Sequence, residues 1–113
     1  MHVPNKQTME KQLWIGVVEV RPLKGSRTLE DSKGAFVNLV TWASDAEGYR
    51  CNADLVLTEL GLFIVSVENP EPVWMRRQNA ELDEEIEDII ARAQDNPDAI
   101  IYGTFHTWDR DTG

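Results

Sequence analysis

The chain has one cysteine, Cys51, in 113 residues, and it lacks any long apolar run. A single cysteine excludes an intrachain disulfide, and chains without a disulfide framework are typical of reducing compartments. The opening MHVPNKQTMEKQ is polar where a secretory signal peptide is apolar, and no segment approaches the roughly 18 apolar residues of a membrane span. We therefore expect a cytoplasmic protein that has no membrane partner.

Basic residues are also scarce. Eleven Lys and Arg residues stand against 20 Asp and Glu residues, which gives a formal charge of −9. Such a charge repels nucleic acid phosphates and attracts basic proteins. A sheet that stacks RNA bases would need Lys or Arg among its aromatic residues, and the aromatic segments 35–43 and 99–108 contain none. The sequence thus argues against nucleic acid and favours a basic protein as partner.

Motifs for catalysis, metals and cofactors are missing as well. His106 is the only histidine outside the first residues, and no nucleophile is placed beside it by sequence spacing. Paired zinc-ligand spacing, a calcium loop and a glycine-rich phosphate loop are all absent. Cys51 falls on the flank of a predicted helix, where a packing role is expected. We predict no catalytic residue, no metal and no cofactor, which disfavours an enzyme.

Two segments that are present have the pattern of amphipathic helices. NAELDEEIEDIIARAQDNP carries an apolar stripe at helical spacing, with Asn79 as the expected cap and Pro97 as the stop. The stripe consists of Leu82, Ile86, Ile89, Ile90 and Ala93. An earlier helix is predicted over about 45–60. The sequence SDAE at 44–47 has the pattern of a capping box that begins at Ser44, and Gly61 suits the turn that follows a helix.

Four segments read as strands because they are rich in β-branched and aromatic residues: 13–20, 35–43, 62–68 and 99–108. A short fifth, VWMR at 73–76, follows a turn signal. From residue 35 onward the order is β-α-β-β-α-β, the split pattern of ferredoxin-like folds. We expect a single α+β domain over 13–113, after a flexible N-terminal arm over 1–12. The predicted fold is a ferredoxin-like variant with an antiparallel or mixed sheet of four to five strands and both helices on one face.

The other face of that sheet is then open, and strand alternation assigns aromatic residues to it. Phe105 is expected in the core. The candidate interface or ligand-facing residues are Phe36, Asn38, Trp42, Tyr102, His106 and Trp108. Exposed together, their rings would form an aggregation-prone patch unless the face is an interface, a ligand site, or covered by the arm or the 22–34 loop.

Two functions from different classes fit this face. The first is a small acidic cytoplasmic protein that acts by protein binding, as a regulator or an immunity-type inhibitor, and forms a homodimer through the open face. The alternative resembles, in architecture alone, the dimeric α+β barrels of small-molecule-binding proteins and cofactor-free monooxygenases. In those proteins such a face lines a cavity, which here would surround His106. We favour protein binding.

Overall fold

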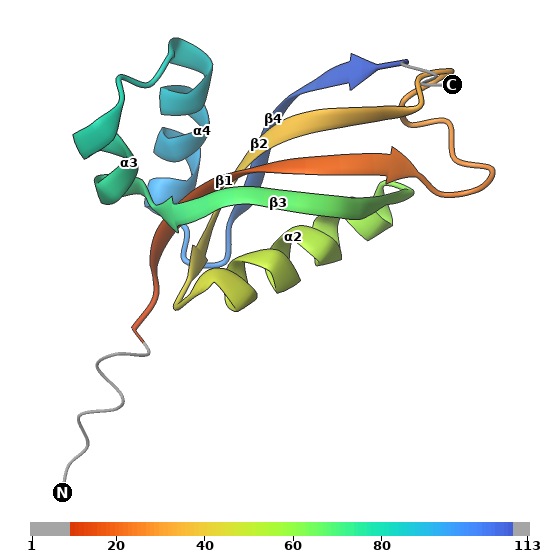
Figure 1. Cartoon of the computed structure of the whole chain (residues 1–113). Helices are drawn as coiled ribbons and strands as arrows, with labels where there is room; N and C mark the ends of the chain where they lie inside the picture. Colours follow the sequence, from red (N-terminus) through yellow and green to blue (C-terminus); the bar gives the residue numbers. More distant parts are fainter. Residues whose placement is uncertain (1–9, 110–113) are drawn as a thin grey trace, which may run out of the picture.

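The computed structural model describes residues 10–109 as one four-stranded antiparallel sheet with three helices, which confirms the α+β class (Figure 1). Its elements, in chain order, are β1 (Gln12–Pro22), β2 (Gly34–Ala43), α2 (Ala46–Glu59), β3 (Leu62–Pro72), α3 (Val73–Asn79), α4 (Glu84–Gln94) and β4 (Ile100–Trp108). No helix within this described part has the length and apolar character needed to cross a membrane.

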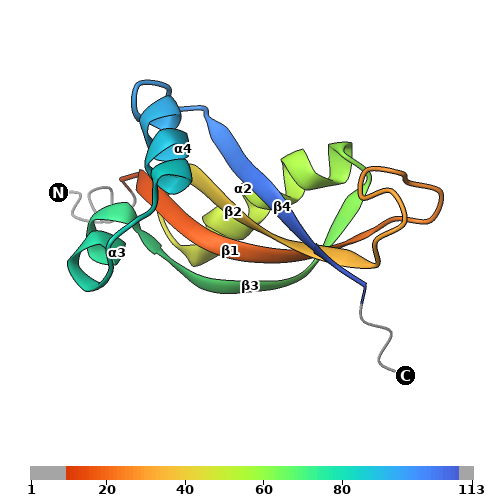
Figure 2. The same cartoon turned by 90° about the horizontal axis from the view of Figure 1, so that it is seen from above.

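The strand order is β3-β1-β2-β4, which differs from the expected ferredoxin-like arrangement (Figure 2). β1 was expected as an extra strand that precedes the split pattern, yet it lies at the centre, paired with β2 on one side and β3 on the other. Its composition explains this place. Ile15 and Val18 point to opposite faces and are both fully buried, so this strand needs cover on both faces.

The helices pack on opposite faces of the sheet, so the expectation that both would cover one face is wrong. α2 lies on one side of the sheet and α4 on the other (Figure 1). Tyr49, Ala53 and Leu57 of α2 share a core with Val18 and its neighbours. The core under α4 contains Ile15 and Val40 together with Ile89, Ile90 and Ala93. The apolar residues of β1 and β2 on both faces are the physical reason for this division.

The segment expected as a fifth strand forms α3 instead. Val73 is the residue of this helix that reaches the core, and Trp74 and Arg77 lie one turn apart on its surface. β-branched and aromatic residues favour strands only weakly, because a pleated surface must be available to pack them. Here Pro72 ends β3, and the chain leaves the sheet.

Aspartates cap the N-termini of the two longer helices, α2 and α4. Asp45, and not Ser44, caps α2, since its side chain accepts from the backbone N–H of Gly48 at 2.8 Å. Asp83, and not Asn79, caps α4 by accepting from the N–H of Ile86 at 2.9 Å. Gly61 follows α2 with a φ of 81°, as its sequence position predicts.

Candidate functional site

α4 covers only one end of its face of the sheet. Beneath it lie the cross-strand pairs Leu13↔Trp42 and Ile15↔Val40, at the start of β1. Toward the opposite end, where the loop between β1 and β2 lies, this face has no helix over it (Figure 2). We call the uncovered residues the open patch. By register it consists of Val17, Glu19 and Arg21 from β1, Phe36 and Asn38 from β2, Phe63, Ser66 and Glu68 from β3, and His106 and Trp108 from β4.

A bulge in β4 moves Tyr102 out of this group. Leu39 pairs with Tyr102 and Val37 pairs with Phe105, so two residues of β4 lie opposite the single residue Asn38. Tyr102 and Phe105 therefore share the α2 side, with ring centroids 5.5 Å apart. The placement of Tyr102 with His106 by simple alternation is wrong.

The bulge is held from α4. The carboxylate of Glu85 accepts a hydrogen bond from the backbone N–H of Thr104 at 3.0 Å and a second one from its hydroxyl. Gly103, inside the strand, was the signal that could have revealed the bulge, because an isolated glycine in a strand pattern often marks one.

Trp42 also lies outside the open patch. Its indole is partly buried under α4, where Nε1 donates to the backbone oxygen of Ala93 at 2.9 Å. Sequence alternation places it on the same face as Phe36, as the structure does, but the expectation that no helix covers it is wrong, because the position of α4 depends on packing far along the chain.

The centre of the open patch is one row across all four strands. Ser66 pairs with Glu19, Glu19 with Phe36, and Phe36 with His106. Ser66 Oγ donates to Glu19 Oε1 at 3.4 Å, and Phe36 lies between Glu19 and the exposed His106 in this row. Residues two strands apart are separated by roughly 10 Å along the row, so Glu19 does not orient His106.

Trp108 forms the next row. Its indole lies against Gly34, where the lack of a side chain leaves room for the ring. The guanidinium carbon of Arg21 lies 5.0 Å from the ring centroid, which is a cation–π contact. The indole Nε1 is buried and has no acceptor among residues 10–109, so ring contacts hold this side chain.

An open hollow of about 420 Å³ borders the patch. It is lined by Arg21, Pro22, Asp31, Ser32, Lys33 and Phe63. Phe63 is 42% exposed and pairs with Arg21 across the strands. The open patch therefore combines aromatic and apolar surface with charges of both signs, and polar and apolar side chains both line the hollow at its edge.

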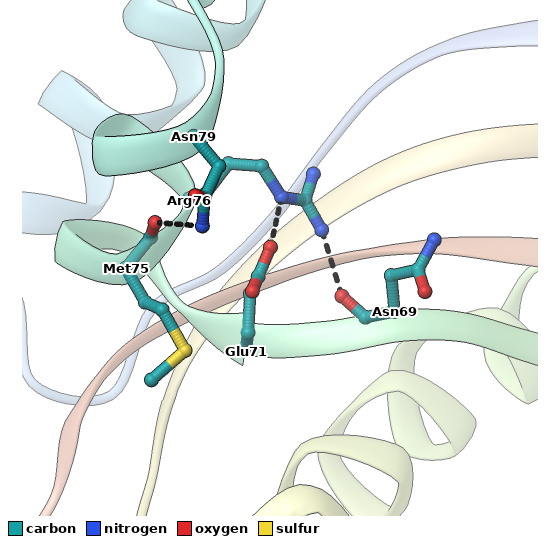
Figure 3. Close-up of polar contacts among 5 residues, drawn as sticks. All are labelled: Asn69, Glu71, Met75, Arg76 and Asn79. Atoms are coloured by element: carbon teal, nitrogen blue, oxygen red, sulfur yellow. Dashed lines mark hydrogen bonds and ion pairs between the residues drawn. The ribbon is translucent and has the colours of Figure 1, made fainter.

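α3 is fixed to β3 beside this face. Arg76 makes an ion pair with Glu71 and donates from Nη2 to the backbone oxygen of Asn69 at 2.7 Å, while Asn79 Nδ2 donates to the oxygen of Met75 within the helix (Figure 3). The ion pair is mostly shielded from water, and a partly buried pair holds its geometry better than an exposed one.

The described residues contain no group of three side chains suited to a metal ion. Burial raises the pKa of the Tyr49 hydroxyl, which donates to the oxygen of Leu39 at 2.7 Å within the core and is no part of the open patch. The open patch thus offers ring faces, a cation and carboxylates, and the Ser66 hydroxyl lies beside the Glu19 carboxylate. Searches of the chain against protein-family models, curated proteins and solved structures found no match.

Proposed function

We propose that the protein is a small acidic cytoplasmic protein that acts by binding other proteins through the open patch. One observation carries this proposal: the aromatic side chains of Phe36, Phe63 and Trp108 lie on sheet rows that α4 leaves uncovered. Aromatic rings bury large areas and are enriched where proteins meet. A contiguous apolar patch on a sheet face is rarely left in water without such a use.

The first partner we propose is a second copy of the chain. The open patch carries Glu19 and Glu68 beside Arg21, so a two-fold contact can place opposite charges against each other. The exposed side of α4 is less suited to self-association. The exposed side of α4 carries Glu84, Glu87 and Asp88, which would repel the same surface of another copy.

The acidic surface supports the second part of the proposal, a basic protein as the other partner. With a formal charge of −9, the molecule attracts a cationic protein over a distance of about 10 Å at ordinary ionic strength. A regulator or an immunity-type inhibitor of a basic toxin would use this field to speed association.

The small-molecule barrel has less support. It needs an enclosed cavity beside His106, yet this side chain is exposed. We therefore do not propose catalysis at His106.

Sedimentation tests the proposal. We expect the unmodified protein to sediment as a dimer at micromolar concentration, and Phe36→Glu to sediment as a monomer, because the symmetry would bury two unpaired carboxylates at the centre of the contact. The matched control is Leu55→Glu, which changes a side chain that is 64% exposed on the opposite face. It should remain a dimer. Far-UV circular dichroism should be unchanged in both variants. A monomeric unmodified protein would refute self-association.

A further inference from the structure

A second hollow lies at the far end of the sheet from Arg21, between α3, α4 and the start of β1. Its volume is about 280 Å³. Its apolar lining consists of Leu13, Val73 and Ile90, all at most 8% exposed, and of the indoles of Trp42 and Trp74. Concave sites with an apolar lining and a few polar groups are the usual form of small-molecule sites, and this volume is near their lower limit of about 300 Å³.

The two indoles are held in place by their own hydrogen bonds. Trp74 is 52% exposed, and its Nε1 donates to Gln12 Oε1 at 2.7 Å. Trp42 Nε1 donates to the oxygen of Ala93. Because both N–H groups already have acceptors, the rings offer carbon surface to the hollow and no donor. Such surface suits a planar apolar group.

The position of α3 is fixed independently of any ligand. Arg76 ties this helix to β3 through Glu71 and Asn69 (Figure 3). Trp74 and Arg77 lie one turn apart on α3, and both line the hollow. The hollow is therefore already formed in the free protein, which reduces the ordering cost of binding.

The polar side chains of the hollow are Gln12, Arg77 and Gln94, and each of them has N–H donors. Gln12 has its carbonyl oxygen occupied by Trp74, which leaves its amide N–H₂. Arg77 uses Nη2 to bind Glu87 and has further N–H donors. Among the residues that line this hollow there is no Asp or Glu, although the chain has 20 of them. A bound group that accepts hydrogen bonds fits these donors, and a carboxylate matches a guanidinium best.

We propose that this hollow binds a small aromatic carboxylate, with the ring between Trp42 and Trp74 and the carboxylate at Arg77. The site is separate from the open patch and does not depend on the proposed function. A molecule of this size should bind with a Kd on the order of a millimolar.

The test uses benzoate and the ¹⁵N-labelled full chain. The four tryptophans give four indole N–H signals, which Trp→Phe variants assign. Benzoate should shift the signals of Trp42 and Trp74 saturably and leave those of Trp14 and Trp108 in place. Absence of a saturable shift at these two signals up to about 20 mM, some 20 times the expected Kd, would overturn the proposal.

Variants separate the ring contact from the charge contact. Trp74→Ala should abolish binding of both benzoate and benzyl alcohol, the neutral analogue. Arg77→Gln should weaken benzoate about tenfold and leave benzyl alcohol unchanged. Glu87→Gln is the matched control: it removes the same ion pair but keeps the guanidinium, so benzoate should bind at least as tightly as before. Equal binding of benzoate to the unmodified protein and Arg77→Gln would refute the carboxylate assignment. Sedimentation of these variants should match the unmodified protein, which keeps this test independent of the dimer.

Discussion

At the scale of the single residue, Gly34 decides the shape of the open patch. The indole of Trp108 lies where a Cβ at position 34 would be, and that Cβ would also lie 2.9 Å from the backbone oxygen of Val20. The ring can rest on the sheet, and receive Arg21 on its face, only because this position has no side chain.

We predict that Gly34→Ala destabilises the protein by about 1–3 kcal/mol, because the methyl group forces the indole of Trp108 off the sheet. Urea unfolding measures the loss, and a change in tryptophan emission reports the displaced ring. Gly48→Ala is the control. It adds a methyl group in α2 with no neighbour closer than 3.3 Å, at a helical position that favours alanine. It should stay within about 1 kcal/mol of the unmodified protein, and an equal loss in both variants would contradict this account.

Tyr49 gives a second prediction at this scale, in alkaline solution. Burial raises its pKa above the ordinary value of about 10. Above that pH the unfolded chain loses the phenolic proton while the folded protein keeps it, so stability falls by up to about 1.4 kcal/mol per pH unit.

Tyr49→Phe removes this titration. It should cost about 1 kcal/mol at pH 7, through the lost hydrogen bond to Leu39, and the cost should shrink above pH 10. Urea midpoints at pH 8, 10 and 11 measure the difference between the two proteins. A constant difference over this range would show that the folded and unfolded states titrate alike.

At the scale of the element, the sequence predicts which helices and strands exist better than it predicts where they end and which face of the sheet their residues occupy. The stripe of α4 is confirmed from Ile86 to Ala93, because a period of 3.6 residues is a local property, whereas Leu82 precedes the helix, which begins at Glu84. The face of Tyr102 is not local. The extra residue at the bulge shifts the alternation between the two parts of the strand, so Tyr102, before the bulge, falls on the α2 side, while His106 and Trp108, after it, lie on the open patch.

The cap of α4 provides the prediction at this scale. Asp83→Ala should cost about 1 kcal/mol, since the N–H of Ile86 loses its acceptor and the first turn loses a favourable negative charge. Asn79→Ala should change stability by less than about 0.5 kcal/mol, as at most exposed positions. The two urea midpoints decide between the caps. A larger loss of stability in Asn79→Ala than in Asp83→Ala would show that Asn79 is the cap of the helix.

At the scale of the whole molecule, the two ends of the sheet differ in charge. The segment 21–33 carries four basic residues and two acidic ones, a net charge of +2, whereas 81–98 carries eight acidic residues and one basic residue, a net charge of −7. These segments lie at opposite ends of the sheet (Figure 1). The sequence alone shows this asymmetry only as an uneven distribution of charge along the chain. The positions of the helices decide which residues of the sheet form the open patch. These positions depend on contacts between segments that are distant in the sequence.

The strand order β3-β1-β2-β4 also bears on how the chain is made. The central hairpin consists of the two strands of this sheet that are synthesised first. β3 then joins one free edge and β4 the other, in the order of translation. No strand has to be inserted between two that are already paired, so the growing sheet offers each new strand an edge as it emerges.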